Sequence, residues 1–406
     1  MPHQHLKALA LLAVTQCFQP PQKNHQSVLL HAKGRGRAAK YHERRDAEQK
    51  YATRLLGLLT HERKEEERVA KERLEKWSDK RLEDAGLSLT GVRCARLPRG
   101  LYGRPVVRLE KPRRRGERAP PLLPRHHRFG SGDLCIVAPG TMGGCGAAEG
   151  TILKTGPRHV DVVLSSAQQA DALAREPSAR LDQCFSAVSY DRMRAAVEAL
   201  TPNARGRDAD DASAELRKVL TRDDAVLAAE RAGGLTRRCP NDAAARRALH
   251  DVSGGELVDA QVRAAVAALT VRVSLIQGPP GTGKTRTAAA LLAAAVALRD
   301  RESKSRLRPE KRRRALACAV SNVAADNLLE ALLRLNVSAV RVGHPAATRE
   351  ELRNHTLDAW ALRLGGDDYA RARPDARDEV RRRALLDADV VVASCVGAGS
   401  DALAPW

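Results

Sequence analysis

VRVSLIQGPPGTGKT, residues 271–285, is the stretch that decides the fold. Its first seven residues are mostly apolar and predict a buried strand over 271–277. An Ala- and Leu-rich helix is expected from the end of the stretch to about Leu298. A strand that runs through a glycine-rich loop into a helix is the setting of a phosphate-binding loop, and it indicates an α/β domain. The alternative is a chance match in an ordinary Gly/Pro turn.

The loop has the residue types that bind a nucleoside triphosphate. Glycines let successive backbone N–H groups turn inward around phosphates, and the helix that follows adds the partial positive charge of its N-terminus. Lys284 is expected to reach the β- and γ-phosphates, and the hydroxyl of Thr285 to bind Mg²⁺. The predicted nucleotide-binding residues of the loop are Gly278, Pro279, Pro280, Gly281, Thr282, Gly283, Lys284, Thr285 and Arg286.

A glutamine precedes the loop by seventeen residues. Gln261 begins a stretch that predicts a helix to Thr270, which would carry its side chain to the mouth of the loop. A Gln amide offers both a donor and an acceptor to an adenine edge. Taken alone, a glutamine is more often an ordinary surface residue.

The next strand is expected over 315–320. It ends in Ser321 and Asn322, and a helix is predicted over 325–335. Ser and Asn at a strand end suit the backbone phosphates of a single nucleic-acid strand. From the spacing alone, an ordinary helix cap is the simpler interpretation.

Before the loop, the residue pattern changes from one typical of a helix to one typical of short strands. Residues 46–83 predict one long, mostly solvated helix, with Glu67 and Lys71 in favourable register for an ion pair. Short β-like runs separated by Gly and Pro then predict a small antiparallel barrel or sandwich. These runs are 91–96, 105–109, 133–137, 150–153 and 160–164. The expected domains are a leader or basic tail at 1–44, a helical stalk at 45–90, the β-domain at 91–190, a returning strut at 191–250 and the nucleotide-binding domain at 251–406.

The net charge of +21 is concentrated in three segments. Residues 1–45, 99–128 and 299–314 have balances of +7, +8 and +6, so a polyanionic partner such as DNA or RNA is expected. The basic run 111–118 falls between two strands, as a phosphate-binding or an unstructured loop. The run 299–314 follows a helix that leads away from the ligand edge of the sheet, which favours a solvated insertion. Only 3% of residues are aromatic, so few side chains are available to stack on nucleic-acid bases.

The N-terminal region has a leader-like composition. Residues 1–42 contain no Asp or Glu, and a short apolar run over 6–14 precedes a basic stretch. This order resembles a bipartite plastid-targeting leader, and a basic tail or a misplaced start codon explains it equally well. No apolar run is long enough to predict a membrane span. The eight cysteines show no C-x-x-C spacing, which argues against a zinc site.

Taken in order, these motifs resemble those of the Upf-like superfamily-one helicases, and most closely the immunoglobulin mu-binding (Smubp) type. The resemblance covers about residues 45–406. Its motor segments are LIQGPPGTGKT at 275–285, SNVAADNL at 321–328, RVGHPA at 341–346, NHTLDA at 354–359 and ADVVVASCVGAG at 388–399. LYGRPVVRLE at 101–110 and FGSGDLCIV at 129–137 are similar to the β-barrel inserted in that family.

The resemblance implies a RecA-like first motor domain with a parallel sheet, incomplete here, and a small β-barrel on helical struts. It implies ATP and Mg²⁺ in the loop, Gln261 on the adenine, and Lys284 and Thr285 in catalysis. It also implies that Ser321, Asn322, Ser394 and Gly397 lie near the nucleic acid. Family members are ATP-dependent helicases that move 5′→3′ on single strands of DNA or RNA, in the cytoplasm or nucleus.

Two departures from the family pattern affect the expected activity. Val320 stands where the family usually has Pro, and the Asp-Glu pair that binds Mg²⁺ does not occur before Trp406. We therefore expect a fragment or truncated gene model that binds ATP and hydrolyses it poorly. If the chain is complete, a non-catalytic ATP- and nucleic-acid-binding protein is the alternative. An unrelated P-loop enzyme such as a kinase would leave the other motifs as accidents.

Overall fold

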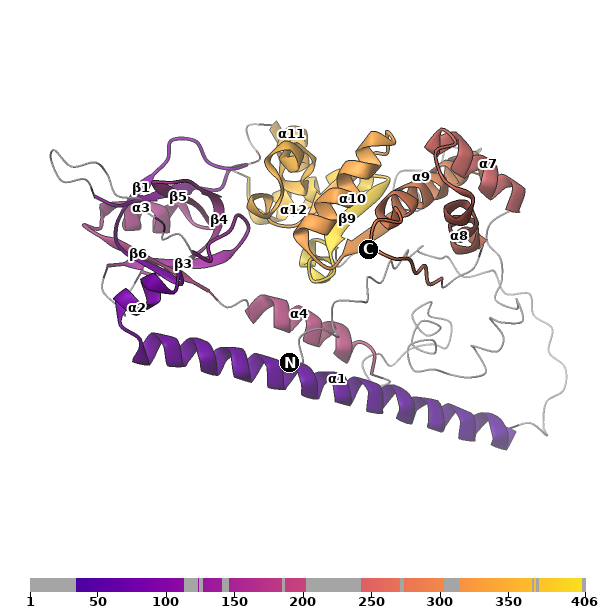
Figure 1. Ribbon diagram of the computed structural model, residues 1–406, viewed down its shortest axis with the longest axis horizontal. Coiled ribbons are helices and arrows are strands. Elements are labelled where there is room, and N and C mark those ends of the chain that lie inside the picture. Colours follow the sequence, from indigo (N-terminus) through magenta and orange to yellow (C-terminus); the bar gives the residue numbers. More distant parts are fainter. Residues whose placement is uncertain are drawn as a thin grey trace. The chain divides into compact units, whose positions relative to one another are not determined.

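The computed structural model describes residues 34–112, 123, 127–140, 146–184, 187–201, 242–270, 274–302, 314–366, 369 and 372–403 (Figure 1), with backbone alone at 34–45, 74 and 300–302. The chain divides into two compact units. The first comprises Met1–Glu62, Ser189–Ala339 and Leu386–Trp406, and the second comprises Arg63–Val188 and Val340–Leu385. Most of the predicted leader and of the basic runs 111–118 and 299–314 lies outside the described residues.

The long charged helix predicted over 46–83 is present as two helices. α1 spans Gly34–Lys76, and α2 spans Asp79–Asp84 after a break at Trp77 and Ser78. The break has a local cause, because the Ser78 hydroxyl accepts the N–H of Arg81 at 3.3 Å and so caps a new helix. None of the helices that the structure describes combines the length and apolar character needed to cross a membrane.

Ion pairs one turn apart run along the exposed part of α1. The predicted pair between Glu67 and Lys71 is not formed. Glu67 pairs with Arg63 at 2.7 Å, and Lys71 lies 3.7 Å from Glu75. Glu67 and Lys71 each have an opposite charge one turn away on both sides, so the spacing rule alone does not select the partner.

A closed antiparallel barrel of six strands forms the core of the second unit (Figure 1). Its strand order is β1-β2-β5-β4-β3-β6. The strands are β1 Ser88–Arg96, β2 Val106–Glu110, β3 Leu134–Pro139, β4 Ala148–Thr155, β5 His159–Leu164 and β6 Ala179–Gln183. The five predicted runs all fall on strands, and the open choice between barrel and sandwich is resolved as a barrel. The helix α3, Ala167–Arg175, packs against the barrel through Ala170 and Leu173.

The strand that closes the barrel is absent from the sequence prediction. β6 pairs antiparallel with both β1 and β3. Its sequence ARLDQ has one large apolar residue, Leu181, so it lacks the alternation that marks a strand. Arg180 is 2% exposed, and its guanidinium donates to Asp182 at 2.6 and 2.7 Å and to Asp79 at 3.2 Å. These bonds satisfy a buried cation that would otherwise oppose folding.

The outer face of the barrel packs closely against a short 3-10 helix, η2, Pro345–Ala347. Val106 and Val163 share a buried cluster with Ala346. The contact is tightest at Gly132, where φ is +90° and an added Cβ would lie 2.8 Å from the Cα of Ala347. Only glycine fits that backbone angle and that space. The RVGHPA segment therefore lies directly against the barrel.

The remaining elements of the second unit are η3 Glu350–His355, α11 Leu357–Gly365 and most of α12 Pro374–Asp387. Those of the first unit include α4 Ala187–Glu198, α7 Asp242–Ser253, α8 Asp259–Thr270, α9 Lys284–Glu302, β7 Ala315–Ala319, α10 Asn322–Arg334 and β9 Val390–Ser394. The sheet has the order β7-β9-β8, with β8 at Ala339–Val342, and β7 pairs in parallel with β9. Side chains of α7, α8 and α9 form a separate apolar core.

The strand predicted over 271–277 is wrong in the part that the structure describes. Residues 274–277 form no strand, and Leu275 is 78% exposed. An apolar run becomes a buried strand only where neighbours complete its hydrogen bonds and cover its side chains. No described strand pairs with residues 274–277, so the apolar pattern alone was insufficient. The predicted helices at 261–270, 285–298 and 325–335 are present as α8, α9 and α10.

His344 fixes the turn that leads into η2. Its Nδ1 accepts the N–H of Ala346 at 3.3 Å. Burial, together with the positive charge of Arg104, lowers the pKa of His344 to about 4, although Asp358 acts in the opposite direction. The imidazole is therefore neutral in the folded protein at neutral pH.

This lowered pKa predicts a pH-dependent stability. The unfolded His344 has the higher pKa, so between about pH 6.5 and pH 4 it takes up a proton before the folded protein does. The free energy of unfolding should therefore fall by on the order of 2 kcal/mol as the pH is lowered through that window.

His344→Asn keeps an acceptor for the N–H of Ala346 and removes the titrating group, so it should flatten the dependence of stability on pH. Urea unfolding followed by tryptophan fluorescence at several pH values measures this. His61→Asn, on exposed α1, should change nothing; an unaltered slope in His344→Asn contradicts the assignment.

Candidate nucleotide site

The predicted phosphate-binding loop forms a turn directly before α9. Gly281 and Gly283 have φ angles of +80° and +77°, which favour glycine. α9 begins at Lys284, so the loop ends on a helix N-terminus with unsatisfied N–H groups. Positive φ angles followed by a helix N-terminus are the backbone arrangement that suits phosphate binding.

The Lys284 side chain folds back over the loop. Its Nζ donates to the carbonyl oxygens of Gly278 at 2.8 Å and Pro279 at 2.7 Å. The hydroxyl of Thr282 also donates to the Pro279 carbonyl, at 2.8 Å. The ammonium thus lies on neutral acceptors inside the loop, and no carboxylate among the described residues pairs with it.

Gln261 lies at the loop, as the sequence predicted, and both ends of its amide are engaged there. Nε2 donates to the carbonyl oxygen of Thr282 at 3.0 Å, and Oε1 accepts the N–H of Val258 at 3.1 Å. The fit is close, because a Cβ added at Gly283 would lie 2.6 Å from Nε2. Gln261 therefore ties the start of α8 to the loop.

Two residues that sequence reasoning missed help to hold the loop. Glu256 accepts from Arg286 at 2.6 Å through its carboxylate and at 2.7 Å through its carbonyl oxygen. The buried Thr287 donates from its hydroxyl to the Gly283 carbonyl at 3.0 Å. The only signal for Glu256 was an opposite charge thirty residues away, which no spacing rule detects. Arg286, predicted to bind nucleotide, is thus occupied by an ion pair.

Thr285, the predicted Mg²⁺ ligand, is exposed in the first turn of α9. Its hydroxyl makes no hydrogen bond to the part of the chain that the structure describes. That same part contains no cluster of three or more His, Cys, Asp or Glu side chains placed to hold a metal ion. The loop nevertheless fits a nucleotide with Mg²⁺, because Mg²⁺ is commonly held by one or two side chains together with phosphate oxygens.

The predicted nucleic-acid residues meet at one edge of the sheet. β7 and β9 run in parallel with Ala319 opposite Ser394, so their carboxyl ends lie side by side. The Ser321 hydroxyl accepts the N–H of Ala324 at 3.2 Å and caps α10, whose first residue is Asn322. Ser394 accepts the N–H of Gly397 at 2.9 Å. The helix cap that the spacing favoured is therefore present. The edge of the sheet at the ends of β7 and β9 lies beside this cap, and Ser321 and Asn322 are exposed there.

Comparisons with known proteins match both parts of the chain. A family described as "Helicase SMUBP-2/HCS1, 1B domain" matches residues 52–183, and one described as "AAA domain" matches residues 256–365. "DNA-binding protein SMUBP-2" of Rattus norvegicus is 29% identical over 332 residues, covering 81% of this chain and 30% of that protein. Both parts of the chain are therefore similar to the Upf-like superfamily-one helicases of the Smubp type. The resemblance predicted from the motifs is thus confirmed, and the "AAA domain" match agrees with a P-loop fold.

Other proteins to which the chain is similar carry helicase names. "ATP-dependent helicase upf1" of Schizosaccharomyces pombe is 31% identical over 159 residues, covering 34% of the chain and 16% of that protein. "DNA polymerase alpha-associated DNA helicase A" of the same organism is 32% identical over 117 residues, covering 29% and 16%. The chain spans about 30% of the length of the SMUBP-2 proteins it matches.

The contact between Gly283 and Gln261 predicts an interaction between two substitutions. Gly281→Ala and Gly283→Ala both place an alanine at positive φ, a strain of about 1–2 kcal/mol. Gly283→Ala must also displace the Gln261 amide, so it should weaken ATP binding about tenfold more than Gly281→Ala. Isothermal titration with ATP and Mg²⁺ measures both affinities. In a Gln261→Ala background the two alanines should become equivalent; an undiminished difference would show that Gln261 does not hold the loop.

Proposed function

We propose that this chain supplies the first motor domain and the β-barrel of an ATP-dependent DNA or RNA helicase that moves 5′→3′ on a single strand. The observation that carries this proposal is the loop at 278–285, with Lys284 folded over it and Gln261 bonded to Thr282. The relatives named as ATP-dependent helicases support it. The motor domain would be RecA-like and comprise residues 251–406, with the barrel at 91–190 on struts at 45–90 and 191–250.

Phosphates of ATP would bind at the loop that Lys284 lies folded over. Its ammonium would then exchange two carbonyl acceptors for charged phosphate oxygens, which form stronger hydrogen bonds. The exposed hydroxyl of Thr285 would bind Mg²⁺, which neutralises phosphate charge when bound. The Gln261 amide would give up at least one of its two present hydrogen bonds, to Thr282 or Val258, and bond the adenine edge instead. Arg286 would reach the nucleotide only after leaving Glu256.

Lys284 and Thr285 should have separable effects on ATP affinity. Lys284→Ala removes the ammonium and should weaken ATP binding at least tenfold, with or without Mg²⁺. Thr285→Ala should abolish most of the gain in affinity that Mg²⁺ confers and leave Mg²⁺-free binding unchanged. Titration of the full chain with ATP, with Mg²⁺ or with chelator, measures both effects. Lys80→Ala removes an exposed lysine elsewhere and is the matched control. Equal affinities in Lys284→Ala and Lys80→Ala would refute the nucleotide site.

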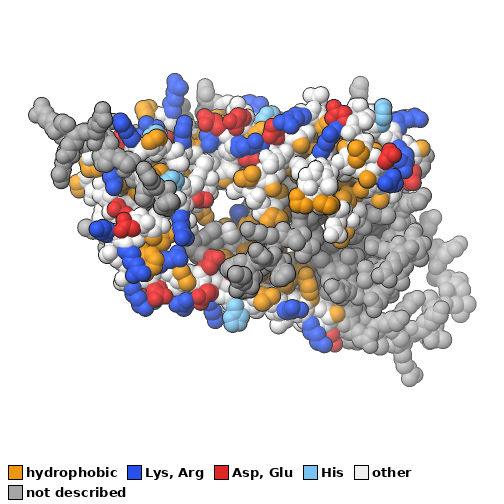
Figure 2. Space-filling model, viewed as in Figure 1, with side chains coloured by type: hydrophobic (Ala, Val, Ile, Leu, Met, Phe, Trp, Pro, Cys, Tyr) orange, Lys and Arg blue, Asp and Glu red, His pale blue; other side chains and the backbone are white. Residues whose placement is uncertain are grey.

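A single strand would lie along the edge formed by Ser321, Asn322, Ser394 and Gly397. This edge combines a helix N-terminus with short polar side chains, which suits backbone phosphates. Charge alone does not select it, because Lys and Arg side chains are mixed with Asp and Glu over the face seen in Figure 2. Local hydrogen-bond donors, rather than a broad basic patch, therefore support the assignment.

Ser321→Asp separates helix capping from strand binding. Aspartate caps helices as well as serine does, so α10 should remain as stable, while its negative charge repels a backbone phosphate. Binding of a short single-stranded oligonucleotide should weaken about tenfold, measured by fluorescence anisotropy. Ser166→Asp makes the same change at the cap of α3, where Ser166 accepts the N–H of Gln169 at 3.3 Å. Equal losses in both variants would mean that Ser321 only caps its helix.

A further inference from the structure

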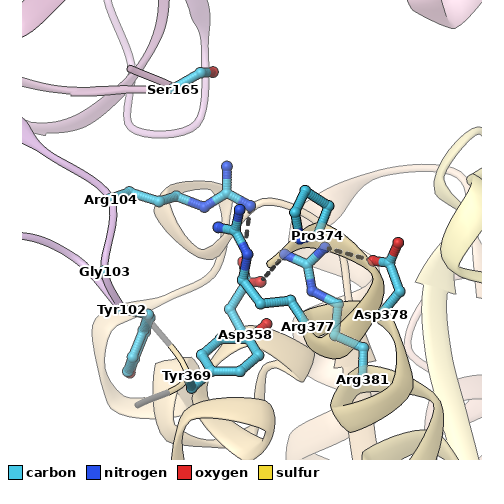
Figure 3. A pocket seen from close by; sticks show the side chains of 10 residues that line it. All are labelled: Tyr102, Gly103, Arg104, Ser165, Asp358, Tyr369, Pro374, Arg377, Asp378 and Arg381. Carbon is cyan, nitrogen blue, oxygen red and sulfur yellow. Dashed lines mark hydrogen bonds and ion pairs between the residues drawn. The ribbon is translucent and has the colours of Figure 1, made fainter. Parts of the chain in front are cut away.

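A polar pocket in the second unit takes no part in the proposed function (Figure 3). Its volume is about 300 Å³. It is lined by Tyr102 and Arg104 from the turn after β1, by Asp358 of α11, and by Arg377 and Arg381 of α12. Ser165, which follows β5, and Tyr369 complete the polar lining. Three guanidinium groups thus line one small cavity.

Both carboxylate oxygens of Asp358 accept hydrogen bonds, each from a different one of the three arginines. Asp358 is 7% exposed. Its Oδ2 accepts from Arg104 at 3.3 Å and its Oδ1 from Arg381 at 2.8 Å, as the dashed lines in Figure 3 show. Asp378 lies 3.7 Å from Arg381 and is largely exposed. Among the described residues that line the pocket, three guanidinium groups thus face two carboxylates.

Several hydrogen-bond donors in the pocket have no acceptor among the residues that the structure describes. Arg377 makes no side-chain hydrogen bond or ion pair with any described residue, and no dashed line reaches it in Figure 3. The Nε of Arg381 and the hydroxyl of Tyr369 are both buried, and neither has a partner at good hydrogen-bond geometry among the described residues, although the two side chains lie close enough to interact with each other. Tyr369 is only 5% exposed. Buried donors are rarely left unsatisfied, so these groups indicate a missing acceptor.

The Tyr369 hydroxyl is held in its donor form. Burial raises its pKa, although the nearby charges of Arg381 and Arg377 act in the opposite direction. The phenol therefore remains protonated at neutral pH. Its O–H adds a neutral donor to the guanidinium groups, and the Ser165 hydroxyl is a further one at the pocket wall.

We propose that this pocket binds a phosphate group. Its donors come from the 101–104 turn, from Tyr369 and from α12, so they approach from several directions. A tetrahedral phosphate presents oxygens in several directions, whereas a carboxylate presents two in one plane, and arginine is well suited to phosphate. The volume is at the lower end of small-ligand sites, enough for a phosphate with an attached sugar. The group belongs to a free phosphorylated molecule or to the backbone of a nucleic-acid strand.

The test uses the full chain carrying Lys284→Ala, so that the loop at 278–285 does not contribute. Pyrophosphate and a short oligo(dT) strand are the two probes, titrated separately by calorimetry and by anisotropy. Arg377→Gln breaks no side-chain hydrogen bond or ion pair among the described residues. Arg383→Gln removes the same charge from an exposed position of α12 outside the pocket. Arg377→Gln should weaken binding at least tenfold, or ~1.4 kcal/mol, while Arg383→Gln changes it less than about twofold. Tyr369→Phe should weaken it in the same direction.

The two probes distinguish the sources of the phosphate. A selective loss with pyrophosphate alone assigns a free ligand, and one with oligo(dT) alone assigns a strand backbone, in which case the site extends the proposed helicase function. A loss with both supports a general phosphate site. If Arg377→Gln and Arg383→Gln behave alike with both probes, the proposal is overturned, and the nucleotide site is unaffected by that result. Should Arg377→Gln lower the melting temperature, Tyr369→Phe, which removes one oxygen atom, decides the question.

Discussion

The buried carboxylate of Asp358 is the constraint on which the second unit depends. One oxygen bonds Arg104 of the barrel and the other bonds Arg381 of α12, so a single side chain joins three segments far apart in sequence. Removing either arginine would leave a buried charge partly unpaired, which is far more costly than losing an exposed ion pair. Two of the same charges also act on His344, whose pKa, lowered mainly by burial, is lowered further by Arg104 and raised by Asp358.

Local pattern predicted the elements whose own residues carry the signal. Short β-like runs between Gly and Pro clusters located five barrel strands, and the charged run located the long helix, because both signals lie within a few consecutive residues. β6 was missed because its own residues lack apolar alternation, while the strands that it pairs with, β1 and β3, lie far away in the sequence. The prediction of a strand over 271–277 was wrong, in the described residues 274–277, for the opposite reason. Its apolar pattern was strong, but no described neighbour pairs with it.

The nucleotide loop was predictable because its function requires particular residue types at fixed spacing. Gly281, Gly283 and Lys284 have the conformations that the motif implies. The groups that brace the loop were less visible, since Glu256 and Thr287 contribute through contacts that any polar residue of similar size could make. Ser321 shows a further limit. One hydroxyl satisfies both the capping and the strand-binding interpretations, so the sequence could not separate them.

The closure of the barrel also sets the order in which this chain acquires structure during synthesis. Ser88 of β1 donates to Asp182 of β6, a partner 94 positions later in the chain. At ribosomal rates of roughly 5–20 residues per second, β1 emerges on the order of 5–20 seconds before the strand that completes its sheet. In that interval one edge of β1 lacks its neighbour and the apolar lining of the barrel is uncovered, the condition under which nascent chains aggregate or recruit chaperones.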